Sequence, residues 1–449
     1  MQSEPRPFRS AGLAAGFVLV LGAAAAQASE PPAARIAAGA APALRSLLLE
    51  VLERNPELSA IGARAEAAAL RGREARGLPD PTLSTTAYLA SPETRVGPQR
   101  FMTSLQQRLP WFGKRGLREQ AALREADGLE ARREARRLEL VTAARRLYAE
   151  IAFLDASRRS LELDRATLVH YEELARARYE SGVGLGQGVI RIQAGISSDD
   201  ARLLEIAIRR ASLVASLNAL RDRPGDAEVG EPRLPPLAVP ELPEAGTLLE
   251  RARRAQPELR RAALEIDRAD ALVGLARKEG SPDVTLGVSY TAVDERTDPA
   301  GILAPPTGNG RDVLAVTVSL NLPVWRGRIA AGLEAAAAQR VGAVEQHRAA
   351  EAEIGRALSE LRERVRLSGE RLRLFEGVLS VQAEQSLKSA EAAYAAGSVN
   401  ALDLLDADRT LLEVSTGEHR ARADLAIALA ELEGAVGEPV KGEAEGGVR

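Results

Sequence analysis

Apolar positions along most of the chain recur every three to four residues, a spacing that predicts long amphipathic helices. Residues 114–180 form a charged, alanine-rich stretch without proline, which predicts one helix of roughly 100 Å at ~1.5 Å per residue. Glycines from Gly182 to Gly188 end this stretch, and residues 189–221 are expected to return as an antiparallel helix. The second half repeats the pattern over 328–396 and 401–436. Both helical hairpins are too long for an ordinary globular core.

In each half the spacing of apolar residues changes from helical to alternating between a short helix and the long one. Residues 313–322 alternate Leu and Val with small or polar residues, and residues 284–292 do the same. The segments 82–90 and 100–109 alternate more weakly. Each is about as long as the ~9–11 residues that a tilted strand needs to cross a bilayer. The pattern predicts two β-hairpins, 82–109 and 284–322, with irregular loops at 91–99 and 294–311.

The two halves also share motifs in the same order. Asn55-Pro56-Glu57-Leu58 recurs as Gln256-Pro257-Glu258-Leu259, Pro79-Asp80 recurs as Pro282-Asp283, and Leu109-Pro110-Trp111 with Gly113-Lys114 is echoed by Leu322-Pro323 with Trp325 and Gly327-Arg328. Such an ordered set indicates a tandem duplication. We expect a first repeat over 41–223, a proline-rich linker at 224–243, a second repeat over 244–437 and a flexible tail at 438–449.

Composition narrows the class of protein. Residues 1–28 carry two arginines, an apolar run and a small-residue cleavage site, as in a secretory signal peptide. The absence of cysteine excludes disulfides, thiolate metal sites and a lipoprotein anchor. A net charge of −3 gives no reason to expect nucleic acid as a partner.

Aromatic residues gather beside the predicted strands. Trp111 and Trp325 each follow the proline that ends the second strand of a pair, and Phe112 lies next to Trp111. Aromatic belts form where a membrane protein meets the lipid interface. We therefore expect Trp111, Phe112 and Trp325 at the edge of outer-membrane lipid.

Four strands imply several copies of the chain. A sheet edge cannot face lipid, because unpaired backbone groups there cost several kcal/mol each. Two copies would give eight strands with a filled interior, whereas three would give twelve and leave room for a channel. The polar inner face favours a homotrimer, with the helical hairpins continuing the barrel as a tube.

These motifs resemble the TolC-like outer-membrane factors of bacterial efflux and secretion systems, over essentially the whole mature chain. The resemblance implies a mainly α fold with membrane β: a trimeric 12-stranded β-barrel in the outer membrane joined to an α-barrel in the periplasm. It also implies partners, a periplasmic adaptor and an inner-membrane pump of the RND or ABC type. The segment from Leu109 to Gly116 looks most like the heavy-metal cation efflux branch.

The resemblance implies a passive exit duct for heavy-metal cations or drugs. A duct for type I protein secretion would have the same architecture. An exported coiled-coil scaffold without membrane strands is a third reading, but it leaves the alternating segments unexplained.

Two groups of candidate site residues follow. Asp403 and Asp406 lie three residues apart, so they share one face of a helix, and by resemblance they match the family's aspartate pair at the periplasmic entrance. Three copies would form two stacked carboxylate rings, which favour cations; helix capping after Asn400 is the alternative. The hairpin turns are expected to contact the adaptor, with intra-hairpin packing as the alternative: Gly182, Val183, Gly184, Leu185, Gly397, Ser398, Val399 and Asn400. The first turn has Gly188 and Arg191 in place of the aspartates, so a carboxylate gate is expected from the second hairpin alone.

No enzymatic or metal chemistry is predicted. His170, His347 and His419 lie singly on charged helices and are expected to face solvent. The glycine run at 182–188 lacks the strand and the lysine of a phosphate loop, so it is expected to be a turn. We expect no cofactor.

Overall fold

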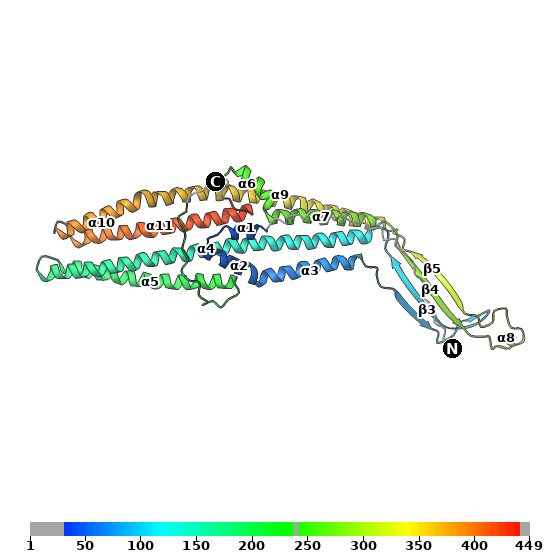
Figure 1. Cartoon of the computed structure of the whole chain (residues 1–449). Coiled ribbons are helices and arrows are strands. Elements are labelled where there is room, and N and C mark those ends of the chain that lie inside the picture. The colour runs from blue at the N-terminus through cyan, green and yellow to red at the C-terminus, as the bar shows by residue number, and fades with distance from the viewer. Residues whose placement is uncertain (1–30, 238–240, 441–449) are drawn as a thin grey trace, which may run out of the picture.

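The computed structural model describes residues 31–237 and 241–440, and the predicted signal peptide lies outside these ranges. The chain forms a long helical bundle with a narrow sheet extending from one end and two helical hairpin turns at the other (Figure 1). In the described ranges, no helix has both the length and the apolar character needed to cross a bilayer.

The first repeat begins with short helices and ends with a long hairpin. Its helices are α1 (Pro32–Ala38), α2 (Pro42–Arg54), α3 (Pro56–Arg76), α4 (Lys114–Glu180) and α5 (Gly186–Leu220). Pro56 separates α2 from α3, where the Asn55 side chain accepts the Glu57 N–H and so caps the new helix. Helix α4 has the range over which one long helix is predicted. Helix α5 begins earlier than predicted, so Gly186 and Gly188 are helical and not part of the turn.

The second repeat has the same order. Its helices are α6 (Ala245–Ala255), α7 (Pro257–Lys278), α8 (Pro299–Leu303), α9 (Arg326–Leu374), α10 (Ser380–Ala395) and α11 (Ala401–Val436). The expected single helix over 328–396 is interrupted by a π-helical turn, Phe375–Leu379. The Phe375 ring lies against α11 at Gly417, where an added Cβ would come within 2.5 Å of the ring. The π-helical turn therefore coincides with packing of the Phe375 ring on α11, and the spacing of apolar residues in the sequence gives no sign of it.

The strands form one antiparallel sheet in the order β1–β3–β4–β5: β1 (Thr82–Ala87), β3 (Gly97–Leu109), β4 (Val284–Val293) and β5 (Val313–Leu320). Both predicted hairpins are present, and β3 pairs with β4 to join the two repeats. The predicted loops are partly regular, since a short strand β2 (Glu93–Thr94) pairs with β3 and α8 lies in the second loop.

The register of the sheet separates an apolar face from a polar one. Leu83, Leu105, Val288 and Val316 pair in sequence across the four strands. Their exposed fractions are 67%, 52%, 49% and 75%. The adjacent row, on the other face, is Ser84, Ser104, Ser289 and Ala315. A single chain thus presents an uncovered apolar face, which soluble monomers rarely do.

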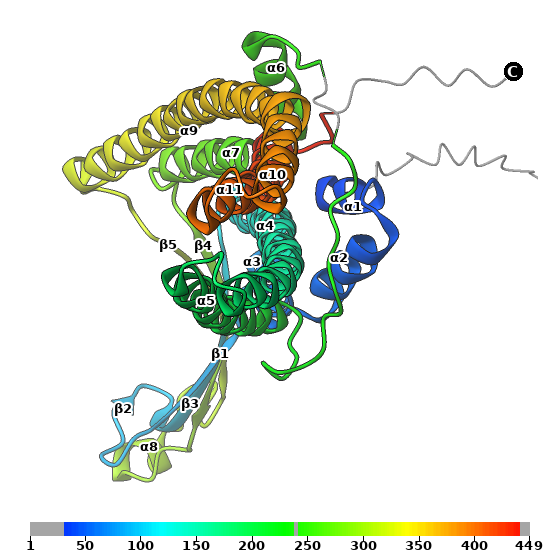
Figure 2. The ribbon, with the colours of Figure 1, turned by 90° about the vertical axis from the view of Figure 1, so that its left-hand side faces the viewer.

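Helix packing builds the rest of the molecule around α4. Helices α3, α5, α7 and α11 all contact α4, and α9 contacts α7 and α11. Viewed from the hairpin turns, α1 and α2 lie on the opposite side of the bundle from α9 (Figure 2). The expected flexible tail is wrong for its first residues, because Val440 is 1% exposed in the core formed by α6, α9 and α11. Residues 441–449 lie outside the described part.

Candidate functional site

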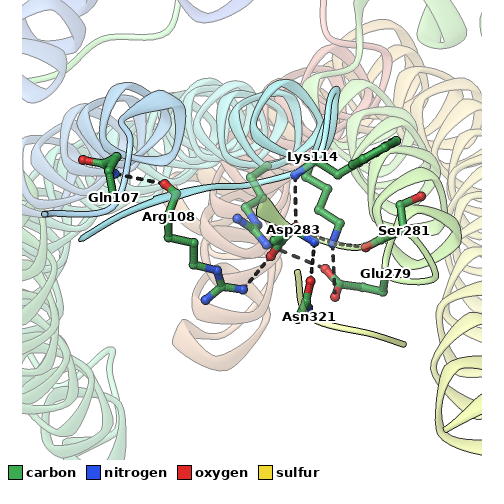
Figure 3. Close-up of polar contacts among 9 residues, drawn as sticks. Gln107, Arg108, Lys114, Glu279, Ser281, Asp283 and Asn321 are labelled. Carbon is green, nitrogen blue, oxygen red and sulfur yellow. Dashed lines mark hydrogen bonds and ion pairs between the residues drawn. The ribbon is translucent and has the colours of Figure 1, made fainter. Parts of the chain in front are cut away.

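The junction between the sheet and the helices is organised around one buried carboxylate, Asp283 (Figure 3). Lys114, at the start of α4, places Nζ 2.9 Å from Asp283 Oδ1 and 3.0 Å from the Ser281 carbonyl oxygen. Arg108, at the end of β3, donates from Nη2 to Asp283 Oδ2 at 2.6 Å. The Trp111 N–H donates to Oδ1 at 3.0 Å. One carboxylate therefore connects β3, α4 and the start of β4.

The burial of this group makes its partners necessary. The side chains of Lys114 and Asp283 are 2% and 4% exposed. Burial acts to raise the pKa of Asp283, but hydrogen bonds from Lys114, the Trp111 N–H and Arg108 outweigh it and lower that pKa. Asn321 holds the backbone on the other side, accepting the Asp283 N–H and donating its own N–H to the Asp283 carbonyl. The angle between sheet and bundle is thus fixed by charge-assisted hydrogen bonds.

The three predicted interface aromatics surround this junction. Trp111 is half-buried, whereas Phe112 and Trp325 are 84% and 73% exposed. Trp111 and Phe112 stack edge to face with ring centroids 5.9 Å apart. Large exposed rings at the base of an apolar sheet fit a lipid interface, and this assignment remains a proposal.

The two hairpin turns lie together at the other end of the molecule. Gly182 and Gly397 both have positive φ, +76° and +77°, a conformation that favours glycine. Val183 and Leu185 are 74% and 77% exposed. Val399 instead packs on a cluster that joins both hairpins. Val399 therefore packs between the two hairpins of its own chain, whereas adaptor contact by the exposed turn residues stays a prediction.

Tyr179 and Tyr394, which match in sequence, also differ in their surroundings. Tyr179 is 56% exposed, whereas Tyr394 is 6% exposed beneath the Arg178 guanidinium, which lies 4.7 Å from the ring centroid. Arg178 also donates to the Tyr394 carbonyl, so it connects the first hairpin to the second.

Asp403 and Asp406 lie on an open groove of about 730 Å³ between the two hairpins. Both side chains are exposed. Asp403 forms a capping box with Asn400: the Asp403 N–H donates to Asn400 Oδ1 and the Asn400 N–H donates to Asp403 Oδ2, each at 3.2 Å. The Asp406 carboxylate has no hydrogen-bond partner among residues 31–237 and 241–440. Asp403 therefore has a capping role, and Asp406 is free to face the groove.

Three further carboxylates line the same groove, and sequence reasoning missed them. Asp164 comes from α4, Asp199 from α5 and Asp408 from α11. Asp199 and Asp408 are 3% and 5% exposed, and Asp199 Oδ2 has no hydrogen-bond donor within the described ranges. Carboxylates of the first hairpin thus reach the groove as well, and a gate formed by the second hairpin alone stays a prediction. Asp164 and Asp199 lie several helical turns from the glycine turn, where no motif marks them.

Mutual repulsion and burial change how this group titrates. Burial, followed by Asp199 and Asp408, raises the pKa of Asp164 to about 9. Burial also raises the pKa of Asp408. The nearest cation to Asp199 is Arg202, 3.6 Å from Oδ1. One proton is therefore expected to be shared by carboxylates on both hairpins.

The histidines do not all face solvent as predicted. His419 is half-buried, because its side of α11 packs on α4, and its Nε2 lies 3.0 Å from Ser160 Oγ. Burial lowers its pKa. In the ranges that the structure describes, no group of three or more His, Asp or Glu side chains is arranged to hold a metal ion.

Comparisons with known proteins agree with this architecture. A family model described as outer membrane efflux protein matches residues 47–222 and 248–438. The outer membrane protein TolC of Vibrio cholerae is 23% identical over 409 residues, covering 88% of this chain and 90% of that protein. The cobalt-zinc-cadmium resistance protein CzcC of Cupriavidus metallidurans is 27% identical over 212 residues, 47% of each chain. The crystal structure of VceC from Vibrio cholerae superposes with a TM-score of 0.72 at 23% identity, covering 89% of this chain and 97% of that one.

Proposed function

Since this chain belongs to the outer membrane efflux protein family, we propose that it forms the exit duct of a tripartite efflux system. Three copies close a 12-stranded barrel in the outer membrane, and their helices form a tube that extends into the periplasm. A periplasmic adaptor and an inner-membrane pump of the RND or ABC type deliver the substrate to the tube. The chain itself supplies a passage and no energy.

One observation carries this proposal: the sheet has an uncovered apolar face, a polar face and open edges. The apolar row Leu83, Leu105, Val288 and Val316 runs across all four strands. Strands β1 and β5 have no strand partner on their outer edges within residues 31–237 and 241–440. In lipid such edges require closure, and copies of the same chain supply the missing strands.

The groove with Asp403 and Asp406 supports a cation-favouring entrance at the opposite end. Carboxylate rings raise the local cation concentration in a pore. The similarity to a cobalt-zinc-cadmium resistance protein makes divalent heavy-metal cations the first substrate class to test.

The deciding experiment combines a deletion strain with the purified protein. The strain should lose tolerance to divalent heavy metals or to drugs, and the wild-type gene should restore it. A gene lacking residues 82–109 removes β1 and β3 and should restore nothing. The purified protein should run as a trimer in mild detergent and conduct ions in planar bilayers. Recovery of a soluble monomer from the periplasm would refute the duct.

A further inference from the structure

Within one chain the two repeats contact each other through helices, strands and a buried ion pair, and we call these contacts the repeat boundary. Helix α4 of the first repeat packs on α7 of the second, and β3 pairs with β4. At the same boundary Lys114 of the first repeat binds Asp283 of the second. In the bundle, in the sheet and at the junction between them, an element of the first repeat therefore contacts an element of the second repeat.

At the two outer sides of the chain, the elements equivalent to those of this boundary are present but lack their partners within the described residues. Helix α9, the counterpart of α4, lies at one side of the bundle (Figure 2). Its Val341 and Val344 side chains are exposed. Strands β5 and β1, the counterparts of β3 and β4, each have one edge without a strand partner in the part of the chain that the structure describes. Asp80, the counterpart of Asp283, is exposed and has no hydrogen bond or ion pair with any other residue of the described part.

The cation counterpart is also exposed. Gly113-Lys114 corresponds to Gly327-Arg328, and Arg328 lies in the first turn of α9. Asn321 stands where the first repeat has Arg108, so the second boundary has lost one of its two cations. An arginine presents five N–H donors in a planar fork, and can hold both oxygens of a carboxylate where lysine holds one. Arg328 can therefore replace Lys114 and Arg108 together.

We propose that Asp80 of one copy binds Arg328 of the next copy, rebuilding between chains the boundary that Lys114 and Asp283 form within one. The partner is a second copy of this chain, and the site is incomplete without it. The proposal rests on the ring of copies described above.

The strand register between copies follows from the same correspondence. Gln107 of β3 pairs with Leu286 of β4. Their counterparts are Leu320 of β5 and Leu83 of β1, so these two residues should pair directly across the copy boundary. Leu83 lies in the same apolar row as Val316, and Leu320 is four residues from Val316 on the same face. This register therefore continues the apolar face around the barrel.

Cysteine crosslinking tests the register, because the chain has no cysteine of its own. In the trimer carrying Leu83→Cys and Leu320→Cys, mild oxidation should produce covalent dimers and trimers on a denaturing gel. Within one chain the two positions are separated by three strand spacings, about 14 Å, and by a further four residues along β5, too far for a disulfide. The shifted pair Leu83→Cys with Val318→Cys is the matched control and should crosslink at least about tenfold less.

Charge reversal tests the ion pair. Asp80→Arg and Arg328→Asp should each lower the temperature at which the trimer dissociates in detergent, and the double reversal should restore it. Arg326→Asp, in the same turn of α9, is the control and should not rescue Asp80→Arg.

The outcomes separate the two proposals. A trimer that crosslinks best at Leu83 with Val318, or that shows no rescue by the double reversal, overturns the boundary and leaves the duct standing. A wild-type protein that is a soluble monomer with no crosslink at either pair overturns both.

Discussion

Individual residues at the junction show how a buried carboxylate is held by charged and polar partners. Asp283 is stabilised as a carboxylate by Lys114, Arg108 and the Trp111 N–H. Removing one partner of a buried ion pair leaves an uncompensated charge, which typically costs ~3–5 kcal/mol. Exposed pairs contribute far less.

Lys114→Met is accordingly expected to destabilise the protein by about 3 kcal/mol, at the low end of that range because Arg108 and the Trp111 N–H still bind Asp283. Thermal unfolding in detergent measures this. The control is Arg118→Met, which removes a partly exposed pair with Glu279 at 3.7 Å and should cost less than about 1 kcal/mol. Equal losses in the two variants would contradict the role given to Lys114.

The buried carboxyls in the groove lead us to expect that the stability of the contact between the two hairpins depends on pH. The pKa of Asp164 is raised to about 9, so its contribution to stability is complete below its ordinary pKa and is lost as the pH rises toward 9. The carboxyls of Asp199 on α5 and Asp408 on α11 face it, and Glu391 on α10 in turn acts on Asp408. The contact between the hairpins should therefore weaken in alkali.

Asp164→Asn should remove this weakening, so that the melting temperature of the variant exceeds that of the wild type by several degrees at pH 9 and by less at pH 5. Asp200→Asn is the matched control, since Asp200 is exposed and paired with Arg165 at 2.6 Å. It should keep the wild-type pH dependence. A wild-type protein equally stable at both pH values would exclude the shared proton.

At the scale of the element, β1, β3, β4 and β5 share one exposed apolar row and one polar row, and we proposed that the apolar row faces lipid. A lysine on the lipid face of a barrel strand costs ~2–4 kcal/mol near the middle of the bilayer. Val316→Lys on β5 should therefore reduce the free energy of folding into lipid vesicles by that amount. Thr317→Lys, one position along the same strand, should change it little. A larger loss for Thr317→Lys would mean that the two faces are assigned the wrong way round.

At the scale of the whole molecule, the proposed cation-favouring entrance requires the exposed Asp406 carboxylates of several copies to lie close together. Asp406→Asn keeps the capping box and should lower the preference of the channel for cations and its block by multivalent cations in planar bilayers. Asp403→Ala removes the N3 partner of the capping box and an acid from the first turn of α11, with an expected loss of ~0.3–1 kcal/mol in stability. If Asp406→Asn leaves selectivity and block unchanged, the acidic ring has no role in conduction.

The sequence by itself determined the long helices, the strand pairs and their order, because these depend on local spacing. Periodicity of 3.6 and of 2, the glycine turns and the prolines predict α4, the strand pairs and the helix breaks from neighbouring residues alone. The duplication is likewise visible in matched motifs such as Pro79-Asp80 and Pro282-Asp283. A π-helical turn at Phe375, which accompanies packing on Gly417 of another helix, leaves no such local signal.

Only the tertiary structure decided which charged residues, far apart in the sequence, come together in buried positions. Lys114 and Asp283 are 169 positions apart, and Asp164, Asp199 and Asp408 come from three helices. Nothing in the spacing of these residues distinguishes them from the many solvated charges on the same helices. Their pairing depends on α4 packing against α7 and α11, and burial at those contacts is what makes each charge need a partner or a proton.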